Sequence, residues 1–144
     1  MKKNKVRPLA ICVFRHNDRI LVAEGYDPVK KQTFYRPLGG AIEFGEQSQQ
    51  TIHRELMEEI GAEVDNLQYL GALENIFIYS GDPGHEIVLV YDGLLKESGL
   101  YDQSVIEGEE AEGEGFFRAM WKSLDEFGAG KSVLYPTGLL EMLG

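Results

Sequence analysis

The sequence predicts an α/β protein in which a mixed β-sheet lies between helices. Apolar runs of strand length, bounded by turn residues, occur on both sides of one amphipathic helix. Two successive pairs of these runs are separated by turn sequences, which favours hairpins. Short helical patterns follow the last run near the C-terminus. Because strands and helices must each bury an apolar face, these observations together indicate a layered fold.

The first predicted strand covers residues 9–14, which are apolar and include β-branched side chains. Residues 16–18 are a turn signal, and residues 19–23 are expected to return as the second strand of a hairpin. His16 is therefore interpreted as a solvated turn residue rather than a catalytic base. Residues 24–33 are predicted to be a polar loop.

The central helix is predicted to begin near Ser48, a suitable N-cap, and to end at Gly61. Glycine tolerates the left-handed conformation that commonly follows the last turn of a helix. Ile52, Leu56 and Ile60 recur at every fourth position, which is the spacing of an apolar stripe facing a core.

The rest of the chain continues the alternation of strands and turns. Residues 67–79 are mostly extended, residues 80–84 are a strong turn, and residues 87–91 are an unbroken apolar run, which predicts a second hairpin. Residues 97–115 are rich in glycine and acidic side chains, so they are predicted to form a mobile loop. A last strand (116–121), a short helix capped by Ser123 (123–127) and a closing helix (138–143) complete the chain.

The central helix concentrates three carboxylates on one side. Glu58 and Glu59 follow Glu55 at i+3 and i+4, so the three side chains project from one side of the helix. One interpretation is a solvated acidic face that Arg54 partly neutralises. The other is a site for a hard cation, because carboxylate oxygens suit Mg²⁺ and Mn²⁺.

The complete pattern around this helix favours the cation site. It resembles the Nudix box, Gx5Ex7REUxEExGU with U apolar, at every fixed position. The matching residues are Gly40, Glu46, Arg54, Glu55, Leu56, Glu58, Glu59, Gly61 and Ala62. Leu38 stands where a proline usually precedes the paired glycines, and Ala62 is the smallest choice for the last apolar slot. Neither departure touches a candidate metal ligand. A W-x-x-L-D-E-F run from Trp121 also resembles the family's strand-to-helix junction.

The resemblance to Nudix hydrolases implies an α/β/α sandwich and a reaction. The expected reaction is divalent-metal-dependent hydrolysis of a phosphoanhydride bond in a nucleoside diphosphate linked to another group X. The products would be a nucleoside monophosphate and phosphorylated X. The resemblance implies Mg²⁺ or Mn²⁺ as cofactor, bound by Glu55, Glu58 and Glu59. The alternative is a non-catalytic Nudix-fold module that binds nucleotides or regulates a partner, although such a module has no need to keep every acid of the box.

Further roles are carried over from the resemblance. Arg54 would orient the ligand carboxylates, and Glu58 or Glu59 could take the proton from the attacking water. Glu46 is expected to pin the loop rather than to bind the ion directly. Gly39 and Gly40 would supply the backbone freedom for the tight loop at the start of the box.

Four further features are candidates outside the box. Arg36 could grip a substrate phosphate, with a surface arginine as the alternative. Glu86 begins an apolar strand and could orient a base or reach a metal, or it could be a solvated strand end. A late glutamate, with Glu112 as candidate beside Glu110 and Glu114, could be the extra ligand or general base that the family often has. Phe77 and Tyr79 alternate with isoleucines and could form an aromatic wall for a nucleobase.

Composition limits the class of protein. The 144 residues, 43% of them hydrophobic and 26% charged, predict one soluble domain spanning residues 1–144. The formal net charge of −10 disfavours a nucleic-acid polymer. It would also repel a small phosphorylated nucleotide, the expected substrate, unless bound divalent cations cancel charge where the phosphates sit. Cys12 is the only cysteine and is expected to be buried. The chain shows no signal-peptide pattern and no membrane-spanning apolar run, so a cytoplasmic protein is expected. Family members often form homodimers, a point this sequence does not decide.

Overall fold

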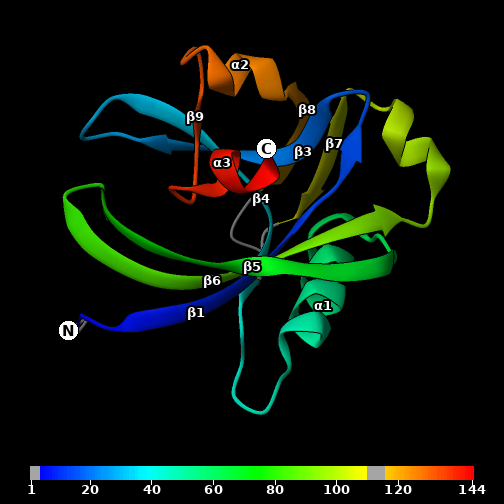
Figure 1. The fold of residues 1–144 in the computed structure, drawn as a ribbon, viewed down its shortest axis with the longest axis horizontal. Coiled ribbons are helices and arrows are strands. Elements are labelled where there is room, and N and C mark those ends of the chain that lie inside the picture. The colour runs from blue at the N-terminus through cyan, green and yellow to red at the C-terminus, as the bar shows by residue number, and fades with distance from the viewer. Residues whose placement is uncertain (1–3, 110–115) are drawn as a thin grey trace.

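The computed structural model describes residues 4–109 and 116–144. Figure 1 shows a large twisted sheet with helix α1 on one side and helices α2 and α3 on the other. The α/β/α sandwich with a mixed sheet is therefore confirmed. The helices are α1 (Ser48–Ile60), the 3-10 helix η1 (Ser98–Asp102), α2 (Leu124–Gly128) and α3 (Leu139–Leu143). The strands are β1 (Val6–Val13), β2 (Arg15–His16), β3 (Arg19–Asp27), β4 (Gln32–Ala41), β5 (Val64–Tyr79), β6 (Asp82–Leu95), β7 (Val105–Glu109), β8 (Phe116–Ser123) and β9 (Val133–Leu134).

Strand β4 belongs to both halves of the sheet. The strand order is β5-β6-β1-β4-β3-β8-β7, with β2 added to β3 and β9 added to β4. The last residues of β4 pair with β1, whereas its first residues pair with β3. The two halves therefore diverge from β4.

The first hairpin differs from the sequence prediction. Strand β1 does not pair with β3; it lies between β6, to which it is parallel, and β4, to which it is antiparallel. The short strand β2 forms the hairpin with β3 instead. The reason is burial, because β1 is apolar on both faces and such a strand is most stable in the middle of a sheet. Residues 24–33 are also not a simple loop, since β3 and β4 extend to a tight turn within them.

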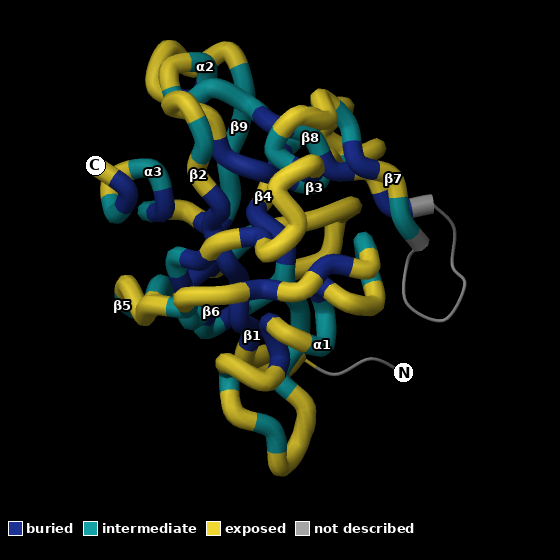
Figure 2. The backbone as a smooth tube through the Cα atoms, turned by 90° about the vertical axis from the view of Figure 1, so that its right-hand side faces the viewer, coloured by how far each residue is buried: buried dark blue, intermediate teal, exposed yellow. Residues whose placement is uncertain are grey.

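Two core clusters lie on opposite faces of the β1 half of the sheet. Ala10 and Cys12 pack with Ile52 and Leu56 of α1, which confirms the predicted stripe and the burial of the cysteine. The alternate residues of β1 pack in the second cluster, on the face away from α1. Figure 2 shows that burial is concentrated in the middle of the sheet, while the hairpin tips are exposed.

The predicted ends of α1 are correct to within one residue. Gln47, not Ser48, is the N-cap, and its backbone N–H donates to the side chain of Gln50 at 2.7 Å. The Ser48 hydroxyl, which is not used as the cap, instead hydrogen-bonds the Tyr91 hydroxyl at 2.6 Å. Gly61 closes the helix in the left-handed conformation, with φ of 65°, as predicted.

The segment 97–115 was predicted to be a loop, and that prediction is wrong for the part that the structure describes. Helix η1 and strand β7 lie within it, and β7 pairs with β8. The second hairpin (β5 with β6) is confirmed, as are the Ser123 cap of α2 and the closing helix α3. In the described part of the chain, no helix is long and apolar enough to cross a membrane.

Candidate active site

The acidic side of α1 rests against the end of strand β4 at Gly40. A Cβ atom on Gly40 would lie 2.5 Å from Cδ of Glu55, which is closer than atoms can approach. Glycine is therefore required for the Glu55 carboxylate to sit there. Burial raises the pKa of Glu55, the charges of Glu58 and Glu43 raise it further, and Arg54 opposes them.

Arg54 is the centre of the hydrogen-bond network around these acids. Its Nε and Nη2 donate to the two oxygens of Glu46 at 2.8 and 3.0 Å, which is a bidentate pair. Its Nη1 donates to Glu55 at 2.8 Å and to Glu58 at 2.9 Å. Its Nη2 also donates to the Ala41 carbonyl at 3.1 Å, which ties the helix to β4. The predicted orienting role of Arg54 is compatible with this geometry.

Glu46 holds the loop that leads into α1. Hydrogen bonds from Arg54, and then from Thr51, lower the pKa of its carboxyl to about 2. The Thr51 hydroxyl donates at 2.7 Å, and the Glu43 backbone N–H donates at 3.2 Å. Since these bonds and the Arg54 pair use both of its oxygens, Glu46 fits the predicted loop-pinning role better than that of a metal ligand.

The donors on α1 suit a divalent cation in their chemistry. Glu55 and Glu58 hydrogen-bond the same Arg54 nitrogen, so their carboxylates already lie close together. A cation beside Glu55 would offset the burial and like charges that now disfavour its ionised form. Among residues 4–109 and 116–144, however, no group of three histidine, cysteine, aspartate or glutamate side chains is already arranged to hold an ion.

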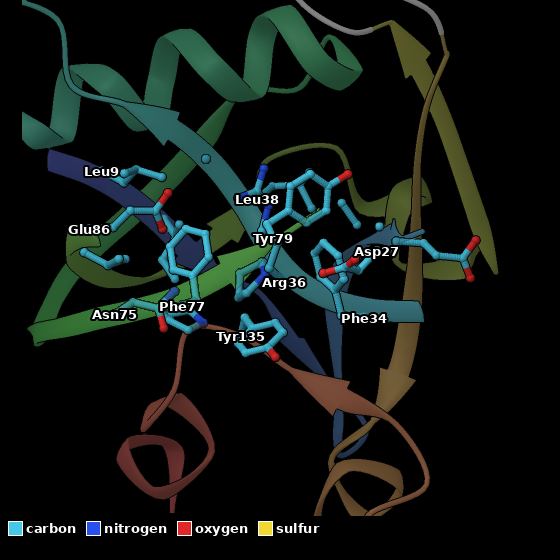
Figure 3. Close-up of a pocket in the computed structure, with 18 of the residues that line it drawn as sticks. Leu9, Asp27, Phe34, Arg36, Leu38, Asn75, Phe77, Tyr79, Glu86 and Tyr135 are labelled. Carbon is cyan, nitrogen blue, oxygen red and sulfur yellow. The ribbon is translucent and has the colours of Figure 1, made fainter. Parts of the chain in front are cut away.

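A cavity of about 490 Å³ lies between the two halves of the sheet (Figure 3). Glu59 of α1 lines it, so the acidic helix and the cavity form one continuous site. Its size falls within the roughly 300–1,000 Å³ of small-molecule sites. Its other polar and aromatic lining residues are Arg7, Glu24, Asp27, Lys30, Gln32, Phe34, Arg36, Asn75, Phe77, Tyr79, Glu86, Phe117, Arg118 and Tyr135.

The predicted substrate-binding residues divide between this cavity and the helix. Arg36 and Gly39 line the cavity, and Figure 3 places Arg36 near its middle. Gly39 has φ of 151°, and a Cβ atom there would lie 2.1 Å from the Ala10 carbonyl oxygen, so no other residue fits against β1. Gly40 instead accommodates Glu55. The structure thus brings the glycine pair to the junction between cavity and acidic helix.

Glu86 lies in the cavity but on the sheet face opposite to α1. Glu86 pairs in register with Arg7. Arg7 lies two residues before Leu9 and so shares its face of β1, and Leu9 packs in the core cluster away from α1. Its carboxylate is buried and lies 3.7 Å from the Arg7 guanidinium. Glu86 is therefore separated by the sheet from Glu55 and Glu58. Glu112, with Glu110 and Glu114, falls outside the described residues.

Several cavity residues carry no sequence signal. Asn75 comes from a segment predicted only to be extended, and Tyr135 precedes the predicted closing helix. Phe77 and Tyr79 do face the cavity, and Phe34 joins them from the other half, with ring centroids 5.9 Å apart from Tyr79 and 5.6 Å from Tyr135. The only available hint was the alternation of aromatic and aliphatic residues in β5.

One end of the cavity is closed by contacts between two hairpin turns. Asp27 is buried, and its Oδ1 accepts from the backbone N–H groups of Val29 and Lys30, while its Oδ2 accepts from Ser80 at 3.1 Å. Burial opposes ionisation, but these backbone hydrogen bonds outweigh it and lower the pKa of Asp27. We call this contact the turn clasp. It joins the β3–β4 turn to the β5–β6 turn.

The sequence-family model of the NUDIX domain matches residues 5–137 of this chain. The chain belongs to the NUDIX family. This confirms the family resemblance that the box predicted.

Curated NUDIX relatives share part of this chain. The NAD-capped RNA hydrolase NudC of Pasteurella multocida is 37% identical over 65 residues, covering 45% of this chain and 24% of its own length. The mitochondrial NAD(P)H pyrophosphatase NUDT13 of Mus musculus is 29% identical over 122 residues, covering 85% of this chain and 31% of its own length. This chain therefore spans about a quarter to a third of these two relatives.

Solved NUDIX structures share the fold over nearly the whole chain. A NUDIX hydrolase from Nitrosomonas europaea superposes with a TM-score of 0.67 at 18% identity, covering 96% of this chain and 86% of the other. A MutT NUDIX hydrolase from Burkholderia pseudomallei gives 0.65 at 18% identity, covering 98% and 100%. At this identity the likeness concerns the fold alone.

Proposed function

We propose that this chain is a divalent-metal-dependent NUDIX pyrophosphohydrolase. Its substrate would be a nucleoside diphosphate linked to a group X. Water would attack one phosphorus of the phosphoanhydride, the bridging P–O bond would break, and the products would be a nucleoside monophosphate and phosphorylated X. The observation that carries the proposal is the continuity of acidic helix and cavity at Glu59. A substrate in the cavity would present its phosphates beside the box carboxylates.

Glu55, Glu58 and Glu59 would hold Mg²⁺ or Mn²⁺. Such an ion, when bound, neutralises charge on the phosphates and lowers the pKa of a bound water. Arg54 would keep Glu55 and Glu58 in place through its short hydrogen bonds. Glu58 or Glu59 would accept the proton of the attacking water. Arg36, in the middle of the cavity, would bind a phosphate oxygen and orient the reacting group.

The names of two relatives indicate which compounds to test first. NUDT13 is named for NAD(P)H, a dinucleotide with the linkage proposed here, and NudC is named for NAD-capped RNA. The net charge of −10 disfavours a nucleic-acid polymer as substrate. A small substrate, a cytoplasmic location and homodimer formation stay predictions for this chain.

A substrate panel tests the proposal. Purified protein is incubated with dinucleotides, nucleotide sugars, dinucleoside polyphosphates and nucleoside triphosphates, with Mg²⁺, with Mn²⁺ or with EDTA. The expected result is release of a nucleoside monophosphate from at least one compound, abolished by EDTA. If compounds bind but none of them is hydrolysed, the non-catalytic module is favoured instead.

A further inference from the structure

Two buried polar side chains lie next to each other at one end of the cavity. Asn75 on β5 and Glu86 on β6 are cross-strand neighbours, and only 5% and 6% of their surfaces are exposed. Figure 3 places both beside Phe77, at the end opposite to Asp27. Burial of polar groups is costly unless they are hydrogen-bonded. The pair therefore needs an explanation beyond the packing of the sheet.

The hydrogen bonds already present determine what this pair offers a ligand. The Thr137 backbone N–H donates to Oδ1 of Asn75 at 3.3 Å, so the oxygen of this amide is engaged and its NH₂ group is the remaining donor. Arg7 lies 3.7 Å from Glu86, which is beyond hydrogen-bond distance. Within the described residues, the Glu86 oxygens accept no hydrogen bond. The cavity end thus presents the Asn75 amide donor beside the two Glu86 acceptors, with the Arg7 guanidinium 3.7 Å from one of those acceptors.

Aromatic rings line the cavity from the Asn75 and Glu86 end, where Phe77 lies, to the Asp27 end, where Phe34 lies. The ring of Phe77 covers Gly84, where a Cβ atom would lie 2.3 Å from the ring. The ring of Phe34 likewise covers Gly25, where the corresponding distance is 2.5 Å. Each ring is thus packed onto a glycine of a neighbouring strand, and Tyr135 adds a further ring. Fixed aromatic faces favour stacking of a planar base with little loss of side-chain freedom.

We propose that this end of the cavity selects a nucleobase with the Watson–Crick edge of guanine. Guanine presents one acceptor, O6, followed by two donors, N1–H and the 2-amino group. The Asn75 amide donates to O6, and the two Glu86 oxygens accept from N1–H and the 2-amino group. Adenine offers one donor and one acceptor, uracil offers one donor between two acceptors, and cytosine offers one donor and two acceptors. None of these pairs with both Glu86 oxygens.

This inference rests on the proposed function, because it takes the base to be part of the nucleoside diphosphate substrate. With the base beside Glu86 and Asn75, the phosphates extend past Arg36 toward Glu59. Glu86 then acts in substrate selection, from the face of the sheet opposite to α1.

Equilibrium binding of the nucleoside monophosphates GMP, IMP and AMP, measured by calorimetry in the presence of Mg²⁺, tests the selection without hydrolysis. IMP keeps O6 and N1–H but lacks the 2-amino group. We expect GMP to bind about 10-fold more tightly than IMP and more tightly still than AMP, because each missing partner leaves a Glu86 oxygen unsatisfied. Equal affinities for GMP and AMP would overturn the inference.

Two substitutions identify the residues responsible. Glu86→Gln is expected to weaken GMP binding about 10- to 100-fold and to bring the GMP and IMP affinities together. Asn75→Asp keeps the acceptor for Thr137 but removes the donor for O6, so it is expected to shift preference toward AMP. Glu74→Gln, an exposed change on the other face of β5, is the control and should leave all three affinities unchanged. Retained GMP preference in Glu86→Gln would contradict the assignment.

Turnover separates this inference from the proposed function. GDP-linked and ADP-linked compounds with the same group X are compared with purified protein and Mg²⁺. GMP selectivity without hydrolysis of either compound would refute the proposed function and leave the base assignment intact. Hydrolysis of both compounds with the same kcat/KM would refute the base assignment and leave the proposed function intact.

Discussion

Because Gly40 has no side chain, the acidic side of helix α1 can pack against the end of strand β4. The Glu55 carboxylate occupies the space that a side chain on Gly40 would fill. We therefore expect Gly40→Ala to displace the Glu55 carboxylate and lower turnover at least about 10-fold, while the free energy of unfolding changes by less than about 1 kcal/mol, because the displaced atoms are the end of a flexible side chain. Steady-state kinetics and chemical denaturation check both effects.

Gly99→Ala is the matched control for this change. A Cβ atom at Gly99 meets no other atom within 4 Å, so stability and turnover should stay near those of the unmodified protein. If Gly40→Ala behaved like Gly99→Ala, the packing of Glu55 against β4 would be of no consequence.

At the level of single residues, the sequence predicts one half of the proposed site. Gly40, Glu55 and Arg54 could be predicted because a helix and its adjoining loop place them by local spacing alone. Asn75 and Tyr135 could not, because they reach the cavity only through strand pairing and a distant C-terminal segment. Pairing between distant segments leaves no periodic signal in the sequence.

At the scale of structural elements, the turn clasp links the β3–β4 hairpin to the β5–β6 hairpin. The sequence pattern does not predict this contact. Asp27→Asn keeps the shape of the side chain but replaces one acceptor oxygen with a donor. Either the bond from Ser80 in the β5–β6 turn or the bonds from Val29 and Lys30 in the β3–β4 turn must therefore be lost. We expect a lower melting temperature at neutral pH and a higher KM, since the clasp closes one end of the cavity.

The pH dependence of this effect has a definite sign. The folded-state pKa of Asp27 is depressed, so its contribution to stability is complete above the unfolded value of about 3.9 and is lost as pH falls through the folded value. The difference in melting temperature between Asp27→Asn and the unmodified protein should therefore shrink below about pH 4. Asp18→Asn, an exposed control, should show no such trend. A difference independent of pH would contradict a role for the ionised carboxylate.

Long, strongly patterned elements were predictable and short or interrupted ones were not. Helix α1 and the β5–β6 hairpin followed from periodicity and turn chemistry. Helix η1 and strand β7 were missed because glycine and acidic residues dominate their segment. The partners of β1 were missed because an apolar run predicts burial but does not say which strands lie beside it.

For the molecule as a whole, charge sets the conditions for binding. A net charge of −10 repels a phosphorylated ligand unless cations intervene. In EDTA we expect weak nucleotide binding that strengthens as salt rises from about 10 to 150 mM, because the screening length falls from about 30 to 8 Å. With saturating Mg²⁺ this salt dependence should diminish. Calorimetric titration of AMP or GMP at several salt concentrations measures it, and binding that weakens with salt in EDTA would contradict the argument.

The most direct test of the account is a Mn²⁺ titration of the protein and of its Glu59→Gln variant, paired with turnover of the best substrate from the panel. Glu63→Gln, an exposed change just beyond the helix, is the matched control. We predict Mn²⁺ binding and hydrolysis in the unmodified protein and in Glu63→Gln. In Glu59→Gln, binding should weaken and turnover should fall by at least about 100-fold with the melting temperature preserved. Full Mn²⁺-dependent turnover by Glu59→Gln, or no Mn²⁺ binding by the unmodified protein, would contradict the proposal that the carboxylates of α1 form the metal site of a NUDIX hydrolase.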